Sequence, residues 1–401
     1  MRMRNVWLAC VTALMASAIS SVASAQTDYE TGLQQARREM FRAERGDRFT
    51  LTAERCVAGI EARDPGRMKP WCNLATDQAI ETRAREQRAA FTEPEQALLL
   101  QAAWVNAVDG LPELALGQNR HPIETVPLGG EADTLRASAY RILADLRSHR
   151  TNEIWRSFQA LMRHLQIPLR RDDTMESVRR RLLDALLSAE HTPERLWAAA
   201  AVALTSEYEF PAGQTLERLQ RESAEIALRV EPLRAETANL SGRDAALAPL
   251  MAYAHARQLQ QARQRSAAAR VYGEGDELCT ARLWASSDLC MELDYLGVLA
   301  AHLAQDEIDH PELANLPYPR KLQGQMRGVA YTEDRCRVIT VGDINDMGAL
   351  DNLRVIYRIG PSSCLQISNE YVETLRYPPI GDANPGERRQ GIVVNFQLRS
   401  E

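Results

Sequence analysis

The sequence predicts an α+β protein, in which a large irregular α-helical array precedes a small β-β-α-β domain. Three observations predict this class. Apolar residues recur every three or four positions over residues 29–310, as in helices. Beyond a proline-marked junction the spacing changes to the alternation typical of strands. A short apolar run at the start of the chain has the form of a signal peptide and precedes both domains. We therefore divide the chain into a signal peptide, a helical domain and a C-terminal domain at residues 1–25, 26–312 and 317–401.

The first 25 residues have the form of a secretory signal peptide. Arg2 and Arg4 precede an apolar run, which ends in the small residues Val22-Ala23-Ser24-Ala25. We expect cleavage before Gln26 and export to the periplasm of a Gram-negative envelope. The alternative is an uncleaved membrane anchor. Because no other stretch offers the roughly 18 to 20 apolar residues of a membrane span, we expect none in the mature chain.

The charge of the chain argues against a nucleic-acid partner. The formal net charge is −6 and falls to −8 once Arg2 and Arg4 leave with the signal peptide. An acidic chain provides no basic footprint for nucleic acid and no polybasic patch for a membrane surface. Only Lys69 and Lys321 are lysines, which leaves almost no side-chain amine for Schiff-base chemistry.

The cysteines favour an oxidising compartment. Six remain after Cys10 is removed with the signal peptide, and they fall into three close pairs. Each disulfide would stabilise the fold by roughly 2 to 4 kcal/mol. Zinc ligation and free thiols are the alternatives, but the sequence contains no Cys-x-x-Cys motif, so we expect no metal. The predicted pairs are Cys56–Cys72, Cys279–Cys290 and Cys336–Cys364.

The helical body reads as a series of helical hairpins. Proline and glycine interrupt it repeatedly, for example at Asp64-Pro65-Gly66. Thr92-x-x-Glu95 and Thr151-x-Glu153 have the residue order of helix N-termini. Because no fixed repeat length is present, we predict an irregular array instead of a solenoid.

Two of the predicted disulfides constrain the helices that carry them. Within one continuous helix, Cys279 and Cys290 would lie about 16 Å apart, whereas a disulfide tolerates roughly 7 Å. The chain must therefore turn between them. We expect that turn at Ser286-Ser287-Asp288, with Ser287 or Asp288 capping the next helix. The pair Cys56–Cys72 would join two helices across the Asp64-Pro65-Gly66 corner.

Two strands open the C-terminal domain. Residues 336–341 form the first, and residues 342–348 provide turn-forming sequence that leads to the second at 353–359. The alternation in the second strand predicts that its apolar and basic residues face opposite sides of the sheet. The apolar set is Leu353, Val355, Tyr357 and Ile359, and the basic set is Arg354 and Arg358.

A helix and a last strand follow the hairpin. Ile367, Tyr371 and Leu375 lie four apart and predict a helix that ends before Pro378. Residues 392–398 alternate again and form the last strand. Because a hairpin returns its second strand to the start of its first, Cys364 should arrive near Cys336.

These elements resemble the C-terminal domain of the TonB family, over about 85 residues. The family's ordered features are a strand ending near Gly-Pro, a helix closing on an Arg-aromatic-x-Pro segment, and a last strand ending in Phe-x-Leu. The matching segments are Asp351-Asn352-Leu353-Arg354-Val355, Gly360-Pro361, Tyr371-x-x-Thr374-Leu375-Arg376-Tyr377-Pro378-Pro379 and Val393-Val394-Asn395-Phe396-Gln397-Leu398.

The resemblance implies recognition by strand addition, in which an edge strand pairs with a short extended segment of an envelope protein such as an outer-membrane transporter. TonB-type transducers retain a membrane helix and a Pro-rich spacer, whereas this chain has a cleavable signal and a helical body. We therefore do not expect it to transduce the proton gradient by itself. The binding residues implied on the last strand are Ile392, Val394, Asn395, Phe396 and Leu398.

The sequence offers little catalytic chemistry. It contains no Gly-x-Ser-x-Gly elbow, no phosphate-binding loop, no dinucleotide glycines and no His-Glu-x-x-His. His302, Asp306 and His310 lie four apart on one helical face, either as metal ligands or as the polar last turn of a helix. Asp343-x-Asn345 begins like a calcium loop, but Met347 and Arg354 fall at ligand positions, which favours a hairpin turn.

We therefore expect a non-catalytic, exported interaction protein that needs no cofactor. Two alternatives remain open at this point. One is a periplasmic hydrolase with its site in the helical body, because catalytic partners can be brought together by the fold alone. The other is a membrane-anchored transducer of the TonB type, if the signal is not cleaved.

Overall fold

The structure is a computed structural model, and it divides into two compact units. One unit comprises Thr27–Gly297 and the other contains Val298–Glu401. The boundary between these units falls within helix α12 (Asp288–Asp309). The proline-marked junction, at which we predicted a domain boundary, lies outside the described residues. The residues that the structure describes are 34–36, 38–43, 47–62, 65–88, 91–108, 131–147, 151–208, 216–282, 287–309, 320–321, 336–345, 347–360, 362–377 and 392–398.

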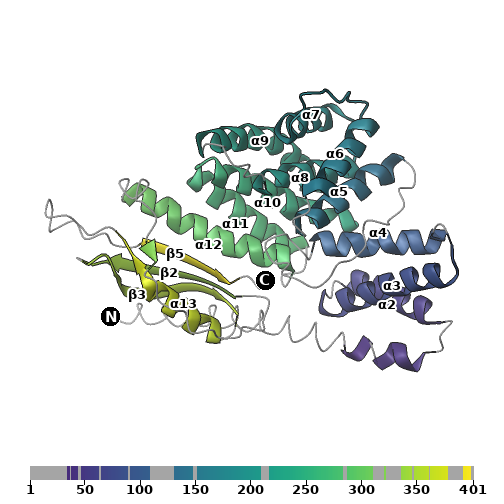
Figure 1. The fold of residues 1–401 in the computed structure, drawn as a ribbon, viewed down its shortest axis with the longest axis horizontal. Coiled ribbons are helices and arrows are strands. Elements are labelled where there is room, and N and C mark those ends of the chain that lie inside the picture. The colour runs from purple at the N-terminus through teal and green to yellow at the C-terminus, as the bar shows by residue number, and fades with distance from the viewer. Residues whose placement is uncertain are drawn as a thin grey trace. The chain divides into compact units, whose positions relative to one another are not determined.

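The first unit is helical (Figure 1). Consecutive helices pack on one another as hairpins, notably α2 on α3 and α10 on α11, while α5 and α10 also pack on α8. Over the described ranges, no helix combines the length and apolarity needed to cross a membrane. The helices are α2 (Arg48–Ala62), α3 (Pro65–Arg85), α4 (Glu93–Val108), α5 (Glu131–Arg147), α6 (Thr151–His164), α7 (Met175–Ser188), α8 (Pro193–Leu204), α9 (Leu216–Glu236), α10 (Leu247–Gln261), α11 (Arg265–Arg282) and the beginning of α12, with 3-10 turns η2 (Thr205–Tyr208), η3 (Thr237–Asn239) and η4 (Gly242–Ala246).

Helix α8 forms the centre of this unit. Thr192 caps its first turn, because the backbone N–H of Arg195 donates to the threonine hydroxyl, and Pro193 occupies the first turn. Every residue from Arg195 to Leu204 is buried. Its run of alanines allows close packing of neighbouring helices, and Trp197 makes an edge contact with Tyr140 of α5 at 5.1 Å between ring centres.

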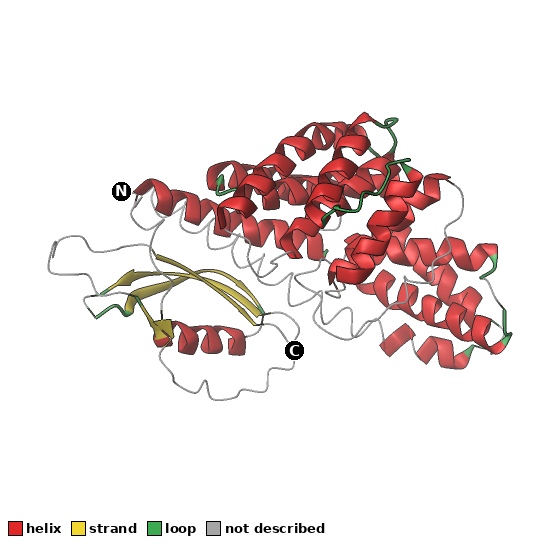
Figure 2. Cartoon of the chain, turned by 45° about the horizontal axis from the view of Figure 1, so that its top comes forward, coloured by secondary structure: helices red, strands yellow, loops and turns green. Residues whose placement is uncertain are grey.

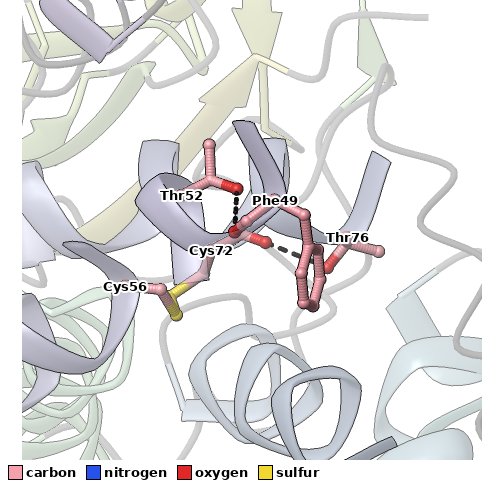
Figure 3. The surroundings of a disulfide bond; sticks show 5 residues. All are labelled: Phe49, Thr52, Cys56, Cys72 and Thr76. Carbon is pink, nitrogen blue, oxygen red and sulfur yellow. Dashed lines mark hydrogen bonds between the residues drawn. A yellow bond between two sulfur atoms is a disulfide. The ribbon is translucent and has the colours of Figure 1, made fainter. Parts of the chain in front are cut away.

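A disulfide between Cys56 and Cys72 joins α2 to α3, as predicted (Figure 3). Both cysteines are buried, and their Cα atoms lie 4.7 Å apart. The hydroxyl of Thr52 donates to the carbonyl of Phe49, and that of Thr76 donates to the carbonyl of Cys72, each at 2.9 Å. The disulfide therefore lies between two helical turns whose buried threonine hydroxyls are satisfied within their own helices.

The turn predicted between Cys279 and Cys290 is also confirmed. Helix α11 ends at Arg282 and α12 begins at Asp288, which brings the two Cα atoms within 5.5 Å in a disulfide. Ser287 is the cap, because its hydroxyl accepts the backbone N–H of Cys290 at 3.2 Å.

The second unit contains a three-stranded antiparallel sheet with one helix (Figure 2). The sheet order is β3-β2-β5, and a separate two-stranded pair joins β1 to β4. The predicted sequence of strand, strand, helix and strand is confirmed. Its elements are β1 (Arg320–Lys321), β2 (Cys336–Ile344), β3 (Leu350–Ile359), α13 (Ser362–Thr374), β4 (Leu375–Arg376) and β5 (Ile392–Leu398).

Leu375 requires a correction. We predicted it inside the helix, but α13 ends at Thr374 and Leu375 begins β4. The backbone of Leu375 pairs with that of Lys321 in β1, which replaces the helical hydrogen bond. The side chain is nevertheless buried against the sheet, as the apolar pattern required.

Helix α13 covers one face of the sheet. Two apolar clusters lie between them, and the disulfide Cys336–Cys364, with its Cα atoms 5.4 Å apart, joins β2 to the helix as predicted. The clusters are Ile344, Leu350, Val372, Leu375, Tyr377, Ile392 and Val394, and Cys336, Val338, Cys364, Ile367 and Phe396.

Candidate functional site: the edges of the C-terminal sheet

The three-stranded sheet has two outer strands. The central strand β2 pairs with β3 on one side and β5 on the other. Among the described residues, β3 and β5 pair with β2 alone. The side of each outer strand that faces away from β2 pairs with no other described strand. Such an edge can accept an added strand, so both edges are candidate docking sites.

The implied binding residues on β5 divide between the core and the surface. Ile392, Val394 and Phe396 are buried in the two clusters beneath α13. Asn395 is exposed, and it lies opposite Ile339 on the sheet face that points away from α13. The side chain of Leu398 lies outside the described residues. A partner on β5 would therefore meet backbone groups and outward side chains, while the apolar residues hold the strand in place.

The side chains of β3 face differently from our prediction, because a bulge interrupts the alternation. Val355 lies opposite Thr340 and Tyr357 lies opposite Ile339, so that Ile356 is the extra residue. Directly opposite residues share a sheet face, whereas neighbours along a strand alternate. Val355 and Tyr357 therefore point to opposite faces, and the prediction of a single apolar side from Leu353 to Ile359 is wrong.

The same shift separates the two arginines of β3. Arg358 lies opposite Val338, which packs against α13, whereas Arg354 lies opposite Val341 on the reverse face. Leu353 and Val355, which we predicted on the apolar side of the strand, are 36% and 42% exposed. The sequence could not place this bulge, since it depends on how β2 and β3 pair.

The turn between β2 and β3 is a hairpin turn, as we predicted in preference to a calcium loop. The side-chain carbonyl of Asn345 accepts the backbone N–H groups of Met347 and Ala349, at 3.0 and 2.9 Å. Its amide nitrogen donates to Asp351 at 2.9 Å. Asn345 thus organises the turn through hydrogen bonds to the protein itself.

The predicted His-Asp-His face is only partly described. His302 is exposed on α12, while the side chain of Asp306 and all of His310 lie outside the described residues. Across the described part of the chain, no group of three or more His, Cys, Asp or Glu residues is placed to hold a metal ion.

The helical unit contains a buried ion pair that the sequence did not reveal. The guanidinium of Arg179 on α7 donates to Glu222 on α9, and its Nε donates to the hydroxyl of Thr205 at 2.9 Å. Nearby, the amide of Gln258 on α10 hydrogen-bonds the hydroxyl of Ser206. These groups connect α7, η2, α9 and α10. None of the hydrogen-bonded groups named here is a histidine that could act as the base for a Thr205 or Ser206 nucleophile.

Burial shifts the pKa values of His255 and Asp145 in the helical unit. Burial, assisted by the charge of Arg234, lowers the pKa of His255 to about 4. Its Nδ1 has no hydrogen-bond partner among the described residues. Burial, assisted by the charge of Glu153, raises the pKa of Asp145 to about 7, against the opposing effect of Arg141. These groups lie on different helices, α10 and α5, and act as separate titrating sites.

Comparison of this chain with protein families, with characterised proteins and with solved structures finds no match. The fold class that the structure defines is α+β, with a mostly helical chain and a small antiparallel sheet near the C-terminus.

Proposed function

We propose that this chain is an exported, periplasmic interaction protein whose TonB-like C-terminal module docks an extended segment of an envelope protein along β5. The observation that carries the proposal is the position of β5 at the edge of the sheet, paired only with β2 over the described residues. Three disulfides support an oxidising compartment. The TonB-like order of residues supports an outer-membrane transporter segment as the partner.

The packing of β5 suits this role. Alternate side chains of the strand, those of Ile392, Val394 and Phe396, are held in the core. A strand fixed in this way loses little conformational freedom when a partner pairs with it, so the new backbone hydrogen bonds contribute more fully to affinity. The exposed Asn395 would contact alternate side chains of the partner and contribute to selectivity.

Disulfide trapping on the full-length protein tests docking at β5. The variant Asn395→Cys is mixed with transporter-derived peptides that carry a cysteine at successive positions. Because side chains alternate along a strand, we expect cross-links at every second peptide position. Glu373→Cys, on the exposed side of α13, is the matched control and should give no such alternation. Equal cross-linking at both sites, or none at Asn395→Cys, contradicts docking at β5.

The mass of the protein recovered from the envelope tests export. We expect a mature chain that begins at Gln26 and contains three disulfides. A chain that keeps Met1 and remains in the inner membrane would contradict cleavage and favour an anchored transducer.

A further inference from the structure

The outer strand β3 has a short segment that is exposed on both faces of the sheet. Residues 351–355 are all exposed, although they belong to the ten-residue strand β3. Leu353 and Val355 are among the few large apolar side chains that the described residues expose. Apolar side chains placed together on an edge strand require an explanation, because such an edge readily recruits another strand.

The two apolar side chains point to the same face. Val355 lies opposite Thr340, which shares the α13 side with Val338. A Cβ added to Gly342 would lie 2.7 Å from Leu353 Cδ2. The side chain of Leu353 therefore lies on the face of the sheet to which a side chain at position 342 would point. Gly342 pairs with Ile392, whose side chain is buried on the α13 side. Leu353 and Val355 thus form a short apolar strip along the edge.

Arg354 projects between them to the opposite face. It is exposed and lies opposite Val341. Neither Arg354 nor Arg358, further along the strand, belongs to an ion pair between described residues. Arg354 lies near His302 of α12, where its charge adds to burial in lowering the histidine pKa. Segment 353–355 therefore presents an apolar side chain, a cation and a second apolar side chain, on alternating faces.

We propose that the outer edge of β3 is a second docking site, which binds by strand addition an extended peptide with the pattern apolar, acidic, apolar. The backbone groups of β3 supply the hydrogen bonds common to any added strand. The peptide's apolar residues lie beside Leu353 and Val355, and its carboxylate lies beside Arg354 on the reverse face. This site is distinct from β5 and does not depend on docking there.

A second copy of the chain fits this edge poorly. Two copies of β3 that pair around a two-fold axis place residues opposite each other in a reciprocal manner. The register that sets Leu353 against Val355 also sets the two Arg354 side chains opposite each other. Like charges that face one another across strands are destabilising, so the edge favours a different, acidic partner.

Peptide binding to the full-length protein tests the proposal. The probe is a fluorescent synthetic peptide that alternates valine with glutamate, and its comparison is a peptide of equal length that alternates valine with lysine. We expect the glutamate peptide to bind and the lysine peptide to bind more weakly. In Arg354→Glu the affinity for the glutamate peptide should fall about tenfold, and the affinity for the lysine peptide should rise, because an attractive cross-strand pair becomes repulsive.

Three further variants test whether the peptide binds at the β3 edge. Val355→Lys should also weaken binding, through loss of the apolar strip. Arg171→Glu makes the same charge change at an exposed loop position of the helical unit and should leave the affinity unchanged. An equal loss in Arg171→Glu would show that the attraction is general, and failure of the wild type to bind the glutamate peptide would overturn the proposal. If Asn395→Glu weakens binding while Arg354→Glu does not, the peptide occupies β5 and the β3 site is wrong.

Discussion

The backbone nitrogen of Tyr377 donates to the carbonyl oxygen of Gly348 at 2.8 Å, which ties the turn between β2 and β3 to the end of β4. Gly348 has a φ of +77°, and a Cβ at this position would lie 2.1 Å from the carbonyl oxygen of Tyr377. The close approach of these two backbones therefore requires glycine.

The variant Gly348→Ala should destabilise the C-terminal unit by about 2 kcal/mol or more. Both the left-handed conformation and the contact with Tyr377 oppose a side chain here. The measurement is hydrogen exchange of the β2 and β3 amides, which we expect to accelerate. Gly273→Ala on α11 is the control, since no atom lies within 4 Å of its added Cβ. That variant should be neutral or slightly stabilising, and unchanged exchange in Gly348→Ala would contradict the role assigned to the turn.

His255 should make the helical unit sensitive to acid. Its pKa is lowered to about 4 in the folded chain, against 6.5 for the ordinary group, so the unfolded chain binds a proton first as the pH falls. Stability is then lost between about pH 6.5 and pH 4, by up to about 3 kcal/mol. In His255→Gln, unfolding by urea should depend less on pH over this range. An identical dependence in the wild type and the variant would contradict a buried, neutral histidine.

Asp145 should have the opposite effect. Its pKa is raised to about 7 from 3.8, so the folded chain holds a proton that the unfolded chain has released. The resulting stability is present below about pH 4 and is lost as the pH rises towards 7. Asp145→Asn should therefore stabilise the helical unit at pH 7 relative to the wild type, as measured by urea unfolding. Asp172→Asn, at an exposed loop position, controls for the amide itself and should show no such gain.

The buried pair of Arg179 and Glu222 allows a prediction on stability. Both side chains are almost fully buried, so Arg179→Met removes the cation that balances the charge of Glu222 in the interior. We expect a loss of about 3–5 kcal/mol in the free energy of unfolding. The double variant Arg179→Met/Glu222→Leu should recover most of this loss, because no buried charge remains. A double variant as unstable as the single one would indicate that packing, and not charge, determines the cost.

Several features followed from local sequence because their physical cause is local. The three- to four-residue apolar spacing predicted helices, and Thr92-x-x-Glu95 marked a helix start where the backbone N–H of Thr92 indeed donates to Glu95 at 2.7 Å. The spacing of Cys279 and Cys290 demanded a turn, since a helix holds such residues too far apart.

Other features escaped the sequence because they depend on distant segments. The two-residue strands β1 and β4 are too short to carry any alternation, so the pairing of Lys321 with Leu375 left no periodic signal. The ion pair of Arg179 and Glu222 joins residues 43 positions apart, and nothing near either residue indicates the other.

By itself, the sequence determined the helical body, the order of β2, β3, α13 and β5, and the three disulfides, because side-chain periodicity and cysteine spacing are properties of neighbouring residues. Only the tertiary structure decided which faces β3 presents. The bulge at Ile356 arises where β3 pairs with β2, and it turns Arg354 and Arg358 to opposite faces. Strand pairing brings together segments that the sequence keeps apart, so the edges available to a partner emerge only after the chain has folded.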